Sequence, residues 1–373
     1  MGLPHILTYS DAIAHCVSVL GGNPSQAAHD AILRSIHAAY RELLEARRWN
    51  YLLTLYRIRV EAPYATGTVE YDHTGGATER RLTLTTGTWP TWAASGSVKI
   101  ADVWHKVTTR VSSTVLTLDT TLNPGADVVA GTTYKIVQSQ YSLPTNFVTP
   151  EMPEESNLLR FGRYVRHGEF FGRERYGQGS GSPNAYTVIG DPDNLGRWLL
   201  HTLYESAATE ELDFWYCRRP REIVLSGYQT AHTVGTVSTA ASTTLTGSST
   251  TFDSGMEGSI VRVSSNSTLP TGVDGRNPFA EQRVLGTYSS ATSFTVTSAF
   301  TGTRSGVKYI ISDPLDIEMT MFNAFFRLAE KHLAIERGMR DVKDKIEMAD
   351  MAMRVAADVD ANAIHAREAS PAV

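Results

Sequence analysis

Apolar residues recur every three or four positions near the start of the chain, and this spacing predicts an amphipathic helix over residues 25–47. After Trp49 the period changes to the alternation that is typical of a strand, over residues 53–60. We therefore predict a helix that leads almost directly into a strand, with Trp49 at the junction. The apolar stripe of this helix consists of Ile32, Ile36, Tyr40, Leu43 and Leu44.

Helical patterns also occur at both ends of the chain. Residues 6–20 form a short predicted helix that Gly21 and Gly22 terminate. Residues 313–363 are predicted to be helical as well, with Gly338 kinking or separating two halves. These halves carry the stripes Met319, Phe322, Phe326, Ala329 and Leu333, and Val342, Ile346, Ala349, Met353 and Ala356.

Two regions rich in threonine, serine, valine and glycine show the short alternating patterns of β-strands, one at residues 64–137 and one at residues 232–311. Five segments of the first region recur in the same order in the second. This predicts two copies of one small β barrel or sandwich that arose by duplication. The matching segments are 67–69 and 235–237, 96–100 and 258–262, 106–113 and 283–290, 116–118 and 294–296, and 131–136 and 306–311.

Neither terminal helical region has enough apolar surface to fold alone, so we expect the N- and C-terminal helices to pack on each other. The predicted fold is α+β: a discontinuous helical scaffold with a few strands and two inserted, duplicated all-β modules. The scaffold is assigned to residues 1–62, 139–230 and 313–361, and the modules to residues 63–138 and 231–312. Residues 362–373 are assigned to a C-terminal docking tail, which lacks helical periodicity and is expected to order only on a partner.

Composition narrows the classes of function. The chain has 373 residues and a formal net charge of −5, which gives no overall attraction to nucleic acid or to acidic membranes. Its two cysteines, Cys16 and Cys217, do not make a disulfide framework. No signal peptide is recognised, and no apolar run approaches the roughly 20 residues that span a bilayer. We expect a soluble protein that is made in a reducing cytoplasm and has no membrane partner.

Catalytic and metal-binding patterns are not found. None of the 11 histidines belongs to a zinc-binding motif. The glycine-rich residues 177–181 lack the lysine and the helix of a phosphate-binding loop. Glycoside hydrolysis needs two carboxylates, and the chain has acidic pairs at 154–155, 191/193 and 210–211. A chain with 39 carboxylates is, however, expected to carry such pairs on its surface. We predict no catalytic residues, no metal and no cofactor.

A run of arginine and aromatic residues between positions 160 and 176 is the most unusual local feature. These side chains dominate protein interfaces, and arginine also contacts phosphate backbones. The alternative is a solvated loop in which arginine stems cover apolar side chains. We favour an interface with a protein partner over one with DNA. The predicted docking residues are Arg160, Arg163, Arg166, Phe170, Phe171, Arg173 and Arg175.

Four segments outside the β modules form a recognisable series. They are a helix that ends in Arg-Arg-Trp-Asn at 47–50 and leads into a strand, the sequence Tyr-Ser-Leu-Pro-Thr-Asn-Phe at 141–147, the strands between 186 and 220, and an alanine-rich closing helix. In this order they resemble the head-to-tail adaptors (connectors) of tailed phages, of the tail tube A type. The resemblance covers the scaffold, about half of the chain. The β modules depart from the compact adaptor pattern, so the resemblance implies nothing about their role.

The resemblance implies a structural protein of the virion, located at the head–tail junction, and not an enzyme. It implies a closed ring of about twelve copies that joins the portal to the tail nozzle or tail tube, with DNA passing through the lumen without sequence-specific binding. The ring-forming residues it suggests are Ile32, Tyr40, Phe322 and Phe326. The portal-binding residues it suggests lie in the tail: Asn362, Ile364, His365, Arg367 and Val373.

Two other functions stay open at this point. A tail spike, decoration or receptor-binding protein would use its β modules to bind carbohydrate or a cell surface, and Trp89, Trp92 and Trp104 of the first module suit such a surface. Tryptophans buried in a core are the simpler explanation, and only the first module has them. The third alternative is a cell-wall hydrolase, because parts of phage tails sometimes carry such activity.

Overall fold

The structure, a computed structural model, describes residues 6–74, 76–150, 163–166, 168–170, 185–202, 207–270 and 277–368. It contains α-helices and several antiparallel sheets, which confirms the α+β class. The chain forms two compact units: unit 1 comprises residues 1–51 and 220–373, and unit 2 comprises residues 52–219. The predicted scaffold takes its segments from both units.

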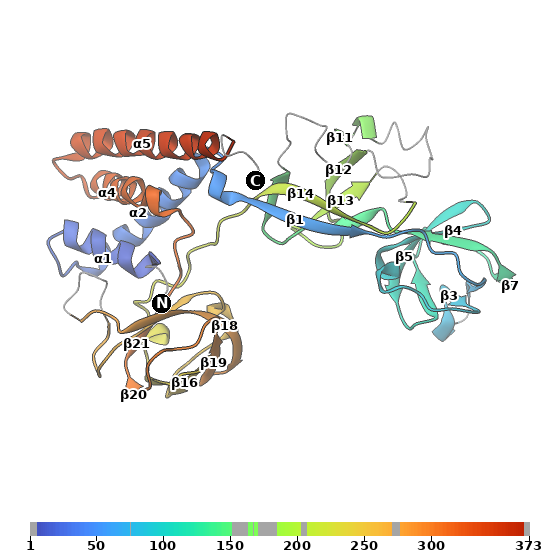
Figure 1. Ribbon diagram of the computed structural model, residues 1–373, viewed down its shortest axis with the longest axis horizontal. Coiled ribbons are helices and arrows are strands. Elements are labelled where there is room, and N and C mark those ends of the chain that lie inside the picture. Colours follow the sequence, from blue (N-terminus) through green and yellow to red (C-terminus); the bar gives the residue numbers. More distant parts are fainter. Residues whose placement is uncertain are drawn as a thin grey trace. The chain divides into compact units, whose positions relative to one another are not determined.

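Unit 1 contains the long helices of the described residues, which are α1 (Tyr9–Val19), α2 (Gln26–Glu45), α4 (Phe322–Arg337) and α5 (Val342–Glu368). Helix α4 packs against both α2 and α5, as Figure 1 shows. Ile36 of α2 and Phe325 of α4 are among the side chains buried in this layer. Helix α1 begins with a capping box, in which the side chains of Thr8 and Asp11 accept backbone N–H groups. Helices from distant parts of the sequence therefore share one core.

The C-terminal helices differ from the prediction at both ends. Helical structure begins at Met319 and not at residue 313, because the preceding segment runs extended beside the start of α1, where the N–H of Leu315 donates to the carbonyl of Leu7 at 2.9 Å. Gly338 ends α4 in the left-handed conformation (φ 60°) and separates the two halves, as predicted. Helix α5 continues through Glu368, so the prediction that residues 364–368 lack helical structure was wrong. Alanine, arginine and glutamate favour continuation of this helix.

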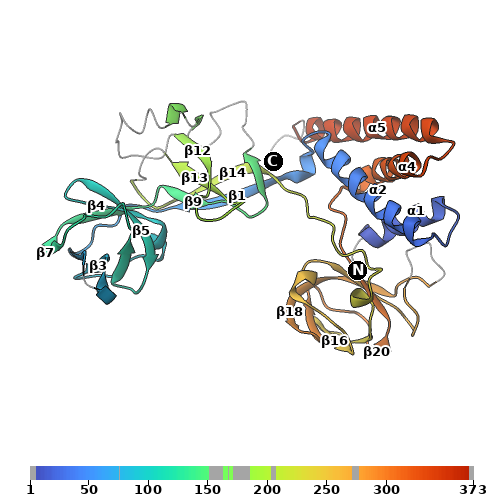
Figure 2. The same ribbon diagram turned by 180° about the vertical axis from the view of Figure 1, so that it is seen from behind.

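Unit 2 contains two small sheets that enclose a common core. In the first, the strand order is β1 (Leu53–Val60), β14 (Glu210–Arg218) and β10 (Phe147–Pro150). In the second, the order is β11 (Arg163–Tyr164), β12 (Ala185–Gly190), β13 (Trp198–Thr202) and β9 (Gln140–Ser142). Figure 2 shows β9, β12 and β13 beside the β1–β14 ribbon. Ile58, Phe147, Leu200 and Tyr216 belong to the core between them.

The two β modules have the same strand order. The first β module belongs to unit 2 and is ordered β7-β2-β3-β6-β5-β4-β8, and the second belongs to unit 1 and is ordered β20-β15-β16-β19-β18-β17-β21. Each strand of one order corresponds to the strand at the same place in the other.

The strands of the first module are β2 (Val69–Asp72), β3 (Arg81–Leu84), β4 (Ser97–Ile100), β5 (Val103–Arg110), β6 (Val115–Leu118), β7 (Val128–Thr132) and β8 (Tyr134–Val137). Those of the second are β15 (Thr236–Thr239), β16 (Thr244–Ser248), β17 (Ile260–Val263), β18 (Glu281–Ser290), β19 (Ser293–Val296), β20 (Arg304–Val307) and β21 (Tyr309–Ser312). Short 3₁₀-helices complete the structure: η1 (Asn50–Leu52), η2 (Gly76–Thr78), η3 (Thr91–Ser95), η4 (Thr230–His232), η5 (Ser254–Met256) and η6 (Met319–Met321).

Strand pairing corrects the predicted alignment of the modules by one residue at β4 and β17. Val98 pairs with Ile136, and the residue that pairs with the equivalent Ile311 is Val261, not Ile260. The shared Gly-Ser dipeptide before each strand suggested the other alignment, but the alternation of core-facing side chains decides the register. The glycines of the first matching segment do coincide. Gly67 and Gly235 both have a positive φ, and a Cβ on either would lie within 2.3 Å of a backbone oxygen.

Candidate interaction surfaces and a pocket

The outer side of α5 carries an apolar row that the rest of unit 1 leaves exposed. Within residues 342–362 of α5, where burial is described, the buried residues are Ala349, Ala352, Ala356 and Asp360, on the side that faces the helical core. One position before each of them lies a second row, here called the α5 stripe, which has the same helical spacing. Its members and their exposed fractions are Met348 (43%), Met351 (70%), Val355 (56%) and Val359 (40%). The apolar arc of α5 is therefore wider than the surface that its own chain covers.

The sequence-based prediction selected the inner row of this helix and missed the α5 stripe. Ala349 and Ala356 of the predicted stripe are buried against the chain's own core. The signal for the outer row was present in the sequence, because two adjacent apolar rows on one helix are more than one helix–helix contact requires.

Charged residues of opposite sign lie beside the α5 stripe and on the outer side of α2. Within residues 342–362 of α5, four acidic residues (Asp344, Glu347, Asp350 and Asp358) and two basic residues (Lys343 and Arg354) are exposed. Helix α2 exposes Arg34, Arg41 and Glu45, and Arg34 is also paired with Glu336 of α4. The two outer surfaces therefore differ in charge.

The four predicted ring-forming residues are not on one surface. Ile32 and Tyr40 are buried in the core of unit 1, and the hydroxyl of Tyr40 donates to the backbone carbonyl of Arg221 at 2.9 Å. Phe322 and Phe326 are partly buried, and the Phe326 ring lies 4.4 Å from that of His15. In this fold Ile32 and Tyr40 serve the chain's own packing, so the exposed α5 stripe is the better candidate for contact with another copy.

The predicted docking loop is described only in part. Arg163 lies on β11, and the side chain of Arg166 is exposed. Phe170 is buried, and its ring centroid lies 5.0 Å from that of His201, so it stabilises unit 2 internally. The other predicted docking residues fall outside the described residues; they are Arg160, Phe171, Arg173 and Arg175.

The predicted portal-binding tail overlaps the end of α5. Asn362 is exposed on this helix. Ile364, His365 and Arg367 belong to its last turns, and Val373 lies outside the described residues. A partner of this segment would therefore meet a helix over residues 362–368.

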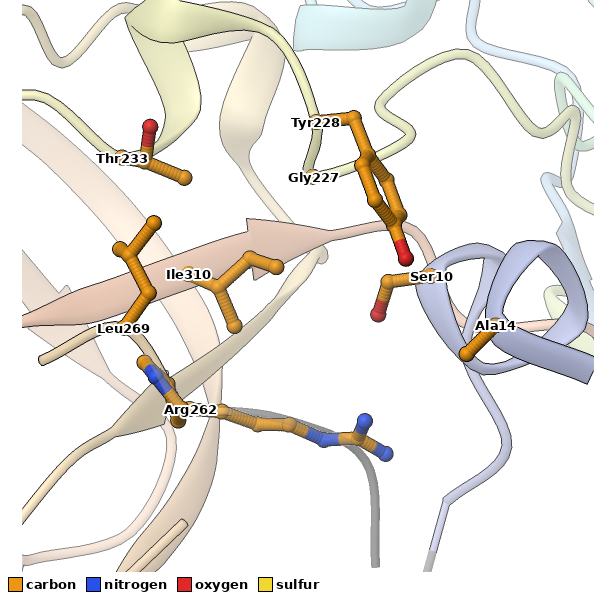
Figure 3. Close-up of a pocket in the computed structure, with 9 residues that line it drawn as sticks. Ser10, Ala14, Gly227, Tyr228, Thr233, Arg262, Leu269 and Ile310 are labelled. Atoms are coloured by element: carbon orange, nitrogen blue, oxygen red, sulfur yellow. The ribbon is translucent and has the colours of Figure 1, made fainter. Parts of the chain in front are cut away.

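A pocket of about 310 Å³ lies in unit 1, between α1 and the second β module. Figure 3 shows Ser10 and Ala14 projecting from α1 on one side and Ile310 of β21 on the other. The Tyr228 ring extends across this space with its hydroxyl toward α1. The other lining residues are Gly227, Thr233, Arg262, Leu269 and Pro270. Apolar surfaces and a few hydroxyl groups thus make up most of the lining.

Arg262 of β17 fixes α1 to the second β module beside this pocket. Its guanidinium donates to both carboxylate oxygens of Asp11, at 2.6 and 2.7 Å, and to the carbonyl of Ile6 at 2.9 Å. Burial raises the pKa of Asp11, but hydrogen bonds and charge from Arg262 outweigh it and lower the pKa below its ordinary value. The Asp11 carboxyl group is therefore ionised at neutral pH. The Nε atom of Arg262 is buried and has no hydrogen-bond partner within the described part of the chain.

Asp313 is a buried carboxylate, only 2% exposed, at which several segments of unit 1 meet. One of its oxygens accepts the N–H groups of Val224 and Leu225, each at 2.7 Å. The other accepts the Ser259 hydroxyl at 2.7 Å and Arg221 Nη2 at 2.9 Å. The backbone carbonyl of Asp313 accepts the first N–H of α1. A single residue thus connects α1, the segment before the second β module and the module itself.

Glu281 forms a similar node inside the second β module, and it predicts a pH dependence. Burial raises its pKa, but the N–H groups of Thr301 and Gly302 and the Arg304 guanidinium outweigh burial and lower the pKa from 4.5 to about 2. A lowered folded-state pKa contributes stability above the unfolded-state pKa of about 4.5, and this stability is lost as the pH falls toward about 2. We expect Glu281→Gln to destabilise the module at neutral pH by on the order of 2 kcal/mol.

The measurement for this prediction is hydrogen exchange of β18 and β20 amides in the unmodified chain and in Glu281→Gln. The loss of protection in Glu281→Gln, relative to the unmodified chain, should be largest above pH 4.5 and should shrink as the pH falls. A difference that is independent of pH would contradict the assignment of this stability to the Glu281 carboxylate.

The surroundings of the tryptophans considered for carbohydrate binding and of the acidic pairs considered for glycoside hydrolysis can be compared with those functions. Trp89 belongs to the core of the first β module, and Trp92 packs against that core. Hydrogen bonds from Asn194 and from the backbone of Asp193 lower the pKa of Asp191, which is the opposite of what a general acid needs. Glu154 and Glu155 lie outside the described residues.

Among the described residues, no group of three or more histidine, cysteine, aspartate or glutamate side chains comes together in a way that would hold a metal ion. None of the described helices combines the length and the apolar character that crossing a membrane requires.

Comparisons with known proteins give no relative for this chain. No protein-family model matches it, and no match was found among curated proteins or among solved structures.

Proposed function

We propose that this chain is a structural protein of the head-to-tail adaptor type, which forms a closed ring between the portal and the tail nozzle or tail tube of a tailed-phage virion. The resemblance of its scaffold segments suggests this class and a ring of about twelve copies. DNA would pass through the lumen without sequence-specific contacts. The two β modules, which share one strand order, would be duplicated insertions in the adaptor scaffold.

The observation that carries the proposal is the α5 stripe. Four apolar side chains stand in one row on a helix, and each is at least 40% exposed in the single chain. Contiguous apolar patches on a monomer typically mark an interaction surface. Covering these side chains would contribute roughly 1 kcal/mol each before the costs of association.

The α5 stripe lies on a surface with more exposed acidic than basic residues, so we place it against the outer side of α2 on a second copy. Glu347, Asp350 and Asp358 lie near the stripe together with Arg354, whereas Arg34, Arg41 and Glu45 are exposed on α2. A contact between two different surfaces of one chain is heterologous, so it repeats from copy to copy and closes into a ring when the rotation permits. Opposite charges would fix the orientation of neighbours more than they would add affinity.

Native mass spectrometry of the purified chain, with and without its cognate portal, tests this function. We expect monomers alone and one large closed ring on the portal. A stable trimer that does not bind the portal would reject the adaptor assignment and would favour a spike or fibre component.

The double variant Met351→Glu/Val355→Glu tests the surface itself. Two carboxylates in an apolar contact lose their hydration, so ring assembly should weaken at least about a hundredfold while the helical circular dichroism stays unchanged. Val129→Glu is the matched control, because Val129 is 78% exposed on β7 and lies outside the stripe. Rings that form equally well from both variants would exclude the α5 stripe as the contact.

A further inference from the structure

The two β modules can be compared position by position. Strand pairing aligns β4, β5 and β8 of the first module with β17, β18 and β21 of the second. Two equivalent tyrosines support this alignment. The hydroxyl groups of Tyr134 and Tyr309 donate, at 2.8 and 2.7 Å, to the carbonyls of the residues just before Gly67 and Gly235. Side chains that alternate with the core residues of these strands therefore form equivalent outer faces.

The second module uses this outer face to hold α1. Arg262 donates to both carboxylate oxygens of Asp11, which lies in the first turn of α1, and the Ser312 hydroxyl accepts the N–H of Ser10 at 3.0 Å. Four of the six outward side chains are buried as a result. The buried ones are Ile260, Arg262, Gln282 and Ser312, and the partly exposed ones are Val284 and Ile310. This face is thus a docking surface for the start of a helix with a carboxylate in its first turn.

The same face of the first module is mostly uncovered. Only Val137 of its six outward side chains is buried. Strand register places Lys135, Lys99 and Trp104 in one row across β8, β4 and β5. Trp104 lies outside the core cluster of the module, unlike Trp89. The partly exposed side chains are Ser97, Lys99, Trp104, Lys106 and Lys135.

Lys99 occupies the position that Arg262 has in the second module, and it also contacts a carboxylate. Its Nζ atom lies 2.9 Å from Asp102, whose side chain is 96% exposed. An exposed pair of this kind contributes little stability, so another carboxylate can replace Asp102 at low cost. A cation at this position thus pairs with a carboxylate in both modules, but only in the second does the carboxylate belong to a docked helix.

We propose that this face of the first module, here called the Lys99 face (Lys99, Trp104, Lys106 and Lys135), binds the start of an acidic helix of a partner protein. Lys99 pairs with a carboxylate in the first turn of that helix, as Arg262 does with Asp11. Trp104 packs on its apolar side chains, and the other two lysines favour further acidic residues.

Nucleic acid fits the Lys99 face less well. Asp102 and Asp193 lie beside it, because each pairs with one of its lysines, and both would repel phosphate groups. The equivalent face of the second module also binds protein. The Lys99 face belongs to unit 2 and needs no ring, so it can be tested whether or not the adaptor function holds.

A peptide with the sequence of residues 6–19 is the probe, because α1 is the helix that the equivalent face holds. A hydrocarbon staple between positions 12 and 16 keeps it helical, on the opposite side of the helix from Ser10 and Ala14. The full chain carries ¹⁵N-labelled tryptophan, and Trp104→Phe identifies the Trp104 indole signal. We expect the peptide to shift this signal. A peptide with Asp11→Asn should bind at least about tenfold more weakly, because it lacks the carboxylate.

Variants of Lys99 test the pairing in both directions. Lys99→Glu should weaken binding about tenfold. Lys99→Arg should strengthen it about threefold, because a guanidinium binds a carboxylate in a bidentate manner, as in the second module. Lys343→Glu is the matched control, since this lysine is 89% exposed on α5, and it should bind normally.

Three results would overturn the proposal. The first is a Trp104 signal that the peptide does not shift, and the second is equal binding of the peptides with and without the Asp11 carboxylate. The third is displacement of the peptide by a short DNA duplex, which would make the Lys99 face a nucleic-acid surface instead.

Discussion

Replacement of Asp313 by alanine is expected to destabilise unit 1 by about 3–5 kcal/mol, because it leaves two buried backbone N–H groups and the Arg221 guanidinium without their shared acceptor. Asp313→Asn should cost less, since its amide oxygen still accepts one pair of donors. The size of the effect follows from the position of Asp313, where α1 and the second β module meet.

The measurement is urea unfolding followed by helical circular dichroism. This signal reports on unit 1, because the long helices of the described residues all belong to unit 1. Five of the six tryptophans, by contrast, lie in unit 2, so their fluorescence supplies an internal reference. Asp358→Ala, an exposed aspartate on α5, is the control and should change stability by less than about 0.5 kcal/mol. An Asp313→Ala chain with an unchanged midpoint would show that the node carries little stability.

Separation of Asp11 from Arg262 should have the next largest effect. Either Asp11→Asn or Arg262→Met leaves one buried charge without its partner, and each should cost about 3 kcal/mol. The double variant should cost less than the sum, with a coupling of about 2 kcal/mol. The cycle cancels the damage to the helix cap, because that damage occurs in both variants of Asp11.

The exposed pair of Arg34 and Glu336 is the matched control for this cycle, since it also joins two helices of unit 1. A cycle of Arg34→Met and Glu336→Gln should give a coupling below about 1 kcal/mol, because water screens and solvates both groups. Equal couplings for the two pairs would mean that burial does not strengthen the Asp11–Arg262 contact.

Local patterns predicted those parts of the fold that local interactions determine. The change of period at Trp49 marks the end of α2 and the start of β1, and the indole Nε1–H of Trp49 donates to the Leu43 carbonyl at 2.7 Å across this junction. Gly338 was identified as a break because glycine adopts the left-handed conformation without strain. Sequence repeats also indicated the two β modules, although the strand pairing shifts the alignment of β4 with β17 by one residue from the one that the repeats suggest.

Interactions between distant residues could not be predicted in this way. Asp11 and Arg262 are separated by 251 positions, and neither stands out from the other charged residues of the chain. The sequence pattern places Asp313 at the start of a helix, but its hydrogen-bond partners come from segments that only folding brings together. The α5 stripe could not be predicted for a different reason. Apolar spacing shows that a helix is amphipathic, but only the packed structure shows which apolar rows the chain's own core buries.

The discontinuity of unit 1 has a consequence for synthesis of the chain. Helix α2 leaves the ribosome before the whole of unit 2, and its packing partner α4 follows only after the second β module. At synthesis rates of roughly 5–20 residues per second this delay amounts to roughly 15–55 s. Unit 2, which is continuous, can fold in that interval, whereas the apolar side of α2 stays exposed until α4 has been synthesised. The N-terminal helices are thus the segment of the nascent chain that chaperones and proteases would meet unprotected for the longest time.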